Sequence, residues 1–102
     1  MVRKFRSVTN LSNDFDAHHI VPVALFGLVR QKYGSSVLNL EELLFSSSNL
    51  MPWAKRSHRS NARALNEELT DWIRDNQQAS FRDFVKEARA AAIRRGAGVK
   101  QP

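Results

Sequence analysis

The longest hydrophobic pattern lies in the second half of the chain and has the period of a helix. Between residues 57 and 76, apolar side chains recur at intervals of three and four positions, which places them on one helix face. Extended backwards by one turn, this face includes His58, with Asn61 at its edge. The pattern therefore predicts a helix that directs His58 toward the interior. Its apolar residues are Ala62, Leu65, Leu69, Trp72 and Ile73.

A second amphipathic helix is predicted to begin at Ser80. Ser80 and Asp83 have the spacing of a capping box, with Asp in place of the usual Glu. Gly96, or Gly98 just after it, is expected to end the helix. We expect this helix and the preceding one to share a core that also buries Trp53 and Trp72, in preference to a base-stacking role for either tryptophan. The apolar face of the second helix contains Phe81, Phe84, Val85, Ala88 and Ala91.

Two short extended segments are predicted in the first half of the chain. The first covers residues 15–21, which follow a stretch rich in turn-forming Asn, Ser and Asp. The second covers residues 49–53, because a residue that precedes a proline avoids the α conformation and Met51 precedes Pro52.

Two shorter helices are predicted between these segments. Pro22 suits the first turn of a helix over residues 22–33, and Gly34 is expected to end it. Asn39 is expected to cap a helix over residues 40–45. Together the elements predict a mostly helical α+β fold, in which a short two-stranded sheet and a helix are embedded among additional helices.

Length and composition indicate one globular domain. The 102 residues are enough for a single modest core, and the hydrophobic fraction of 42% is ordinary for a globular protein. The absence of Cys excludes disulfides and thiolate ligands. No apolar run is long enough to cross a bilayer, and the basic first residues lack the apolar stretch of a signal peptide.

The charge of the chain favours an anionic partner. The formal net charge is +6 and the sequence pI is about 10.5. Nucleic acid is the commonest partner of a small basic domain. The alternative from charge alone is that the basic residues only promote solubility.

Two of the three histidines stand side by side, at His18 and His19. Neutral imidazole is a common metal ligand and also a base near neutral pH. Adjacent side chains of an extended segment point to opposite faces, so the two rings can have different roles. Taken alone, a pair of histidines is more often two unrelated surface residues. The sequence around the pair favours a functional role.

Residues 16–22 (DAHHIVP), then 49–52 (NLMP), then His58 at the start of a helix resemble the HNH, or ββα-metal, nuclease superfamily. The resemblance is to its His-His branch, found in colicin-type and AHH polymorphic bacterial toxin nucleases. It covers roughly residues 14–66, as a ββα-metal core with a helical insertion. Residues 1–13 would then be an N-terminal arm, residues 67–96 a helical support and residues 97–102 a tail.

The resemblance implies a role for each matching residue. His18 and His58 would be metal ligands, and His19 would be the general base that activates water. Asn49 would brace the loop that carries the histidine pair. Asp16 would orient a ligand or a water from the second shell.

The chain departs from the family pattern at the last ligand. The family usually has His or Asn one turn after the first helical ligand, whereas the residue four positions after His58 is Ala62. Asn61, at the third position, faces the same side and is the candidate third ligand. The alternative is that Asn61 bonds locally and a water takes its place. The implied cofactor is one divalent ion: Mg²⁺, Mn²⁺, Ni²⁺ or Zn²⁺.

The implied activity is hydrolysis of DNA with little sequence preference. Four basic residues near His58 would hold the phosphate backbone, although each one could equally be part of an ordinary solvated helix face: Lys55, Arg56, Arg59 and Arg63. An RNA substrate such as tRNA, and a non-catalytic basic module that binds nucleic acid, remain alternatives. Membership of the toxin group further implies delivery as part of a larger secreted protein into a target cell, and a cognate immunity protein that inhibits the domain.

Overall fold

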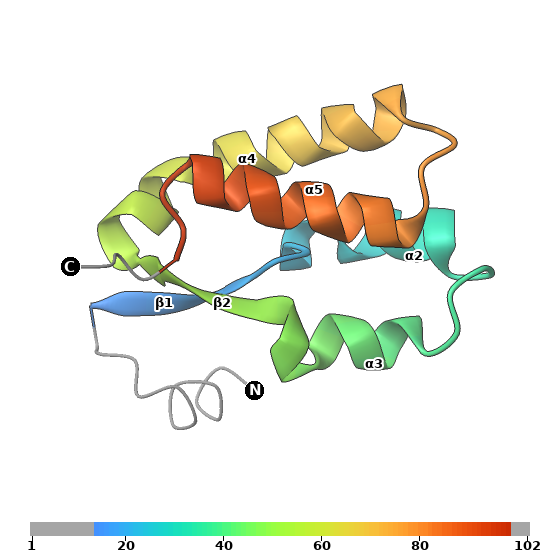
Figure 1. Cartoon of the computed structure of the whole chain (residues 1–102), viewed down its shortest axis with the longest axis horizontal. Coiled ribbons are helices and arrows are strands. Elements are labelled where there is room, and N and C mark those ends of the chain that lie inside the picture. Colours follow the sequence, from blue (N-terminus) through green and yellow to red (C-terminus); the bar gives the residue numbers. More distant parts are fainter. Residues whose placement is uncertain (1–13, 99–102) are drawn as a thin grey trace.

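The structure is a computed structural model that describes residues 14–98. The expected N-terminal arm and the last four residues of the expected tail lie outside this range. Within it the fold is mostly helical α+β, with a two-stranded antiparallel sheet and four α-helices (Figure 1). In chain order the elements are β1 (Phe15–His19), the 3₁₀ turn η1 (Val23–Leu25), α2 (Phe26–Tyr33), α3 (Leu40–Phe45), the 3₁₀ turn η2 (Ser47–Asn49), β2 (Leu50–Ala54), α4 (Lys55–Asp75) and α5 (Phe81–Arg94).

Both predicted extended segments form strands, with somewhat different bounds: β1 ends at His19, two residues earlier than expected, and Asn49 belongs to η2 and not to β2. The two strands pair with each other. In the register of β1 and β2, Asp16 lies opposite Trp53, His18 opposite Met51 and His19 opposite Leu50. The strands are not joined by a tight hairpin, because α2 and α3 lie between them in the chain. The sheet therefore brings together residues that are far apart in sequence.

Helix α4 begins directly after β2, two residues earlier than its apolar pattern indicated. Its predicted face is largely confirmed, since Leu65, Leu69 and Ile73 are buried. The direct strand-to-helix junction fixes the first turn of α4 against the sheet. Among the described residues, no helix is both long and apolar enough to cross a membrane.

The predicted start of α5 is confirmed in detail. The Ser80 hydroxyl accepts a hydrogen bond from the Asp83 N–H at 3.1 Å, and the Asp83 carboxylate accepts one from the Ser80 N–H at 3.4 Å. Gly96 follows the helix with φ of +104°, a conformation that glycine adopts at little cost. After this turn the chain returns to the sheet, where the Gly98 N–H donates to the Pro52 carbonyl at 2.7 Å.

The shorter helices form where they were expected: α3 has its expected bounds, whereas α2 begins later than residue 22. Pro22 is extended and opens the 3₁₀ turn η1, and the α-helix itself starts only at Phe26. Gly34 ends α2 in a right-handed conformation. The capping role expected of Asn39 is wrong: its backbone is left-handed (φ 61°) and its side chain makes no cap hydrogen bond. Asn adopts a left-handed backbone at a lower energetic cost than most other residues, because its side chain is short and polar.

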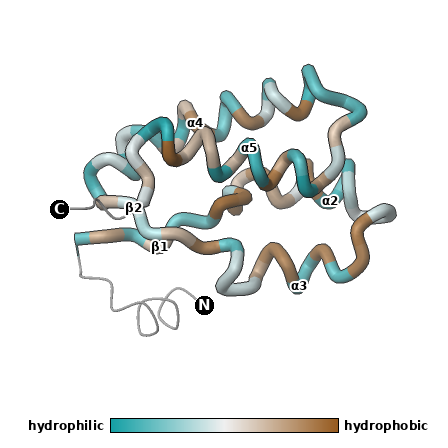
Figure 2. Tube along the Cα trace, in the orientation of Figure 1, coloured by the Kyte–Doolittle hydropathy of each residue, from teal (hydrophilic) through white to brown (hydrophobic). Residues whose placement is uncertain are grey.

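The core lies between the sheet and the helices. Figure 1 shows α4 and α5 side by side above the strands, with α3 on the other side. Figure 2 shows hydropathy alternating along α4 and α5 as one face of each turns inward. Trp53 and Phe84 are fully buried, whereas Trp72 and Phe81 are partly buried and pack against this core.

We predict that Phe84→Ala lowers the free energy of unfolding by about 3–5 kcal/mol, because it leaves a cavity in a fully packed region. The matched control is Phe45→Ala, since the Phe45 side chain is 50% exposed. The control should cost about 1 kcal/mol or less. Urea unfolding monitored by circular dichroism measures both values. Equal losses for the two variants would contradict this description of the core.

Candidate metal and nucleic-acid site

The alternation of side chains along β1 places Asp16 and His18 on one face of the sheet. Trp53, which lies opposite Asp16 in the register, shares this face. The His18 ring meets the Trp53 ring edge to face, with 4.9 Å between centroids. His18 is only 4% exposed. The strand thus directs one of its two histidines into the protein.

His58, in the first turn of α4, completes a row of three side chains. His18 Nδ1 and His58 Nε2 are 3.2 Å apart. On its other side, His58 Nδ1 lies 2.9 Å from the Asp16 carboxylate. Because a carboxylate accepts hydrogen bonds, it places a proton on Nδ1 and leaves the Nε2 lone pair of neutral His58 directed at His18. The structure therefore brings Asp16, His18 and His58 together, and the roles that the resemblance implies for them stay predictions.

Burial keeps His18 neutral. Loss of solvent, together with the nearby His58 and His19, lowers the pKa of His18 from 6.5 to about 3. A neutral imidazole has one lone-pair nitrogen, and because His58 Nε2 is the acceptor, His18 Nδ1 carries the proton, which would move to Nε2 when Nδ1 binds a metal. The second nitrogen of His18, Nε2, is buried and has no hydrogen-bond partner among the described residues.

His19 points to the opposite face of β1, as predicted for the second residue of the pair. Its ring lies edge to face with Phe26, at 6.1 Å between centroids. Partial burial, followed by the charge of His58, lowers the pKa of His19. His19 is half-buried and so remains accessible to water.

Asn49 braces the loop that follows the histidine pair. Its side-chain oxygen accepts from the Val21 N–H at 2.8 Å, and its amide group donates to the carbonyls of Leu44 at 2.9 Å and Val21 at 3.3 Å. Its backbone carbonyl also accepts from the Ile20 N–H at 2.7 Å. Asn49 is 6% exposed. The bracing contacts predicted for Asn49 are present.

A chain of hydrogen bonds supports the histidines from behind. The Trp53 ring also lies against His58, at 5.0 Å between centroids. Its Nε1–H donates to the Ser57 hydroxyl at 2.8 Å, which donates to the Arg95 carbonyl at 3.2 Å. A Cβ on Gly96 would come within 3.0 Å of the Ser57 hydroxyl oxygen. The end of α5 therefore packs closely against the residues behind the imidazoles.

Asn61, the expected third ligand, has other partners. Its side-chain oxygen accepts from the Arg95 guanidinium at 3.3 Å, and its amide donates to the Ser57 carbonyl at 2.9 Å. Arg95 is itself held by two hydrogen bonds to Glu68, at 3.0 and 2.9 Å. The local bonding considered as the alternative for Asn61 is thus present, and its role as a ligand stays a prediction.

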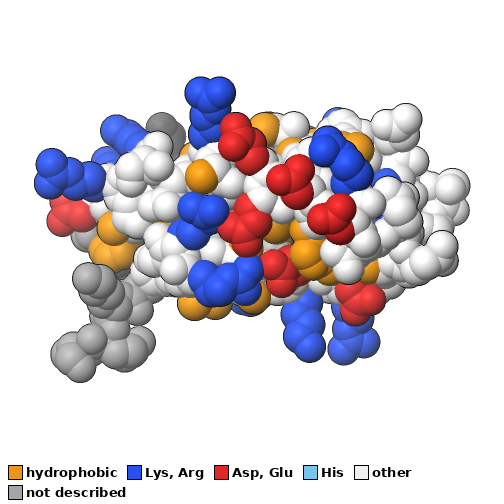
Figure 3. All heavy atoms as spheres, turned by 90° about the horizontal axis from the view of Figure 1, so that it is seen from above, with side chains coloured by type: hydrophobic (Ala, Val, Ile, Leu, Met, Phe, Trp, Pro, Cys, Tyr) orange, Lys and Arg blue, Asp and Glu red, His pale blue; other side chains and the backbone are white. Residues whose placement is uncertain are grey.

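The predicted basic residues lie on the first turns of α4 with different surroundings. Arg56 is exposed, and Arg59 is exposed with its Nε 3.7 Å from the Asp16 carboxylate. Lys55 is half-buried. Arg63 is exposed and pairs with Glu67 on the same helix at 3.4 Å. Figure 3 shows basic side chains with acidic ones beside them at the end of the molecule where α4 begins, and mixed charges over the middle of α4 and α5.

The two long helices begin with opposite electrostatics. The first turn of α5 contains Asp83 in a capping box. The box provides partners for N–H groups at the start of the helix, and the Asp83 carboxylate interacts favourably with the positive end of the helix dipole. The first turn of α4 has no acidic residue and no side-chain cap at Ala54, and it carries Lys55 and Arg56 instead. Cations at a helix N-terminus are unfavourable unless an anion offsets them. At the start of α4 the Asp16 carboxylate supplies such an anion beside His58 and Arg59.

The imidazole pair fits two positions of a shared metal ion. Two nitrogens bound to one tetrahedral Zn²⁺ lie about 3.3 Å apart, close to the 3.2 Å found here. The Asp16 carboxylate at the far nitrogen of His58 is the partner that a ligating histidine usually has. However, residues 14–98 contain no group of three or more His, Asp or Glu side chains arranged to hold a metal. An ion held here would have two protein ligands and several open positions.

Some of the residues that build this site could not be predicted from the sequence. Ser57 is hydrogen-bonded to Trp53, and Arg95 to Asn61. Positions 57 and 95 lie too far apart in the chain for a sequence motif to connect them. The four-residue spacing of Trp53 and Ser57 across the β2–α4 junction is the only local sign of their contact.

No family model, curated protein or solved structure matches this chain.

We predict that Asn49→Ala lowers the free energy of unfolding by at least about 2 kcal/mol, because the Val21 N–H and the Leu44 carbonyl lose their buried partner. The matched control is Asn66→Ala, on a partly exposed turn of α4, which should change stability by less than about 0.5 kcal/mol. Thermal or urea unfolding measures both. A value for Asn49→Ala no larger than that of the control would show that this brace is dispensable.

Proposed function

We propose that this protein is a metal-dependent endonuclease that hydrolyses the phosphodiester backbone of DNA with little sequence preference. The observation that carries the proposal is the 3.2 Å approach of His18 Nδ1 to His58 Nε2, with Asp16 behind one ring. The resemblance of residues 16–22 and 49–52 to the HNH superfamily supports the same conclusion.

His18 and His58 would hold one divalent ion. When bound, the ion supplies positive charge that stabilises the phosphate oxygens and the leaving 3′ oxygen in the transition state. Two neutral imidazoles suit Zn²⁺ or Ni²⁺ better than Mg²⁺, which prefers oxygen ligands. Asp16 fixes the orientation of His58 and raises the basicity of its ligating nitrogen.

His19 is the general base in this proposal. A ring nitrogen of neutral His19 accepts a proton from water as the water oxygen forms its bond to phosphorus. The bond from phosphorus to the 3′ oxygen breaks, and that oxygen takes a proton from solvent. The products are a 5′-phosphate and a 3′-hydroxyl. The lowered pKa of His19 keeps the base unprotonated near neutral pH.

The start of α4 would hold the substrate backbone. Arg56 and Arg59 are exposed there, beside an N-terminus that has no acidic residue in its first turn. Contacts to phosphates fix position and carry no sequence information. Affinity should therefore depend steeply on salt and weakly on sequence.

The resemblance also supports a biological setting. It indicates an effector domain of a bacterial toxin, delivered as part of a larger protein and inhibited by a cognate immunity protein. DNA is the favoured substrate because the superfamily chemistry uses an external water. A structured RNA such as tRNA would be cleaved by the same groups.

One observation favours a second candidate, a non-catalytic module that binds nucleic acid. Residues 14–98 offer no third His, Asp or Glu for the metal, and the Asn61 oxygen is engaged by Arg95. If two imidazoles hold an ion too weakly for catalysis, the basic surface alone would remain functional.

We predict that the wild-type protein nicks supercoiled plasmid when Zn²⁺, Ni²⁺, Mn²⁺ or Mg²⁺ is supplied, and that EDTA abolishes nicking. His19→Ala should lower the rate by about 10²- to 10⁴-fold without weakening DNA binding, because it removes only the base. Gel assays of nicking and fluorescence anisotropy of labelled DNA measure the two effects.

His18→Ala is the companion variant, and it should lose both nicking and metal affinity. Circular dichroism of each variant confirms that it is folded. Plasmid binding without nicking in any of the four metals would reject the nuclease and support the binding module.

A further inference from the structure

Phe45, at the end of α3, is the most exposed aromatic residue among residues 14–98. The other seven Phe, Tyr and Trp side chains of this range are buried or partly buried. Half of this large apolar ring is open to water and can therefore contact a ligand.

The Phe45 ring is linked to the proposed base by one shared neighbour. Phe26 meets Phe45 edge to face at 5.3 Å between centroids, and meets His19 edge to face at 6.1 Å. Phe26 itself is buried. The row of rings thus leads from His19 to a half-exposed aromatic surface.

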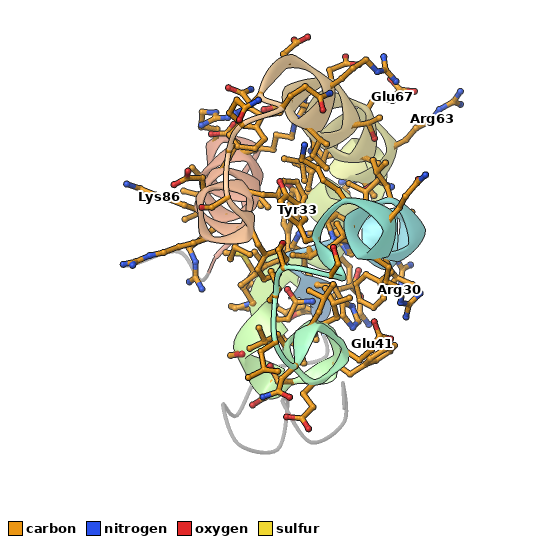
Figure 4. The ribbon with its side chains drawn as sticks, turned by 90° about the vertical axis from the view of Figure 1, so that its right-hand side faces the viewer. Arg30, Tyr33, Glu41, Arg63, Glu67 and Lys86 are labelled. Atoms are coloured by element: carbon orange, nitrogen blue, oxygen red, sulfur yellow. The ribbon has the colours of Figure 1, made fainter. Side chains whose placement is uncertain are left out.

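Two further contacts hold this row in place. The Asn49 amide donates to the carbonyl of Leu44, the residue before Phe45, while its oxygen binds the Val21 N–H just after the histidine pair. Arg30 of α2 forms two 2.8 Å hydrogen bonds with Glu41 of α3, and Figure 4 shows these side chains pointing toward one another. The position of Phe45 relative to His19 is therefore fixed by the fold.

We propose that Phe45 is a nucleobase-binding position, on which an unpaired base near the cleaved phosphate stacks. This inference rests on the proposed function, because it takes His19 as the base beside that phosphate. Aromatic side chains bind bases of any sequence through their π-faces. A base inside a duplex is stacked between its neighbours and cannot offer its face to a side chain. The substrate class that follows is single-stranded or locally unpaired nucleic acid.

The surroundings of Phe45 agree with a polynucleotide ligand. Ser47, two residues after it, is exposed and carries a hydroxyl group that can bond to a base or a phosphate, whereas the Ser48 hydroxyl is hydrogen-bonded to that of Ser46. Arg30 lies 5.7 Å from the centre of the Phe26 ring, in the middle of the row, and is paired with Glu41.

The test compares a fluorescein-labelled twelve-residue deoxythymidine oligonucleotide with the same backbone made abasic. Anisotropy is measured in EDTA, so that binding is read without cleavage. Phe45→Ala should weaken binding to the thymidine strand by about 5- to 100-fold, and Phe45→Trp should restore it. Neither change should alter affinity for the abasic strand or for a blunt duplex.

Leu43→Ala is the matched control, because Leu43 lies on the same helix and is 42% exposed. It should leave thymidine binding unchanged. An equal loss on thymidine and abasic strands, or no loss with Phe45→Ala, would overturn the proposal. So would light scattering that shows a wild-type dimer converted to a monomer by Phe45→Ala, since a second copy would then cover the ring.

The outcome is separable from that of the proposed nuclease. Base-dependent binding through Phe45 without plasmid nicking would retain this site and reject the enzyme. If Phe45→Ala leaves the cleavage of single-stranded and of duplex substrates unchanged, the nuclease is retained and the base-binding role of Phe45 is rejected.

Discussion

The candidate site depends on one contact, in which two imidazole nitrogens from distant parts of the chain meet at 3.2 Å. Three local rules produce it. Strand alternation puts Asp16 and His18 on one face, antiparallel pairing with β2 brings Trp53 to that face, and the absence of a loop before α4 places His58 above it. Asp16 then fixes which nitrogen of His58 carries the proton. Each rule is ordinary, but together they leave a lone pair directed at a buried neutral ring.

The same strand separates two tasks. One histidine is turned inward, where burial holds its pKa far below the usual value, and the next is turned toward Phe26 and water. The C-terminal turn of α5 supports the inward side through Ser57 and Trp53. The outward side is supported by Asn49, which ties the loop after the pair to α3. A site of this kind is held by several elements, so a defect in one should not erase it completely.

Periodicity and motif spacing predicted much of this arrangement. The apolar stripes of α4 and α5, the capping box at Ser80 and the opposite faces of His18 and His19 follow from local rules, and the structure shows all of them. The brace at Asn49 came from the resemblance. What local rules could not predict depends on tertiary contacts. The left-handed backbone of Asn39 and the engagement of Asn61 by Arg95 are set by partners outside the immediate sequence. The ring row from His19 to Phe45 likewise needs α2 and α3 to be placed first.

The central claim is that His18 and His58 share one cation. The most direct measurement is nitrogen NMR of the histidine side chains during titration with Zn²⁺. We expect His18 Nδ1 and His58 Nε2 to shift together and to saturate at one equivalent, while the nitrogens of His19 keep the shifts of the metal-free protein. A shift at only one of the two rings, at His18 Nε2 in place of Nδ1, or at neither ring would contradict this account.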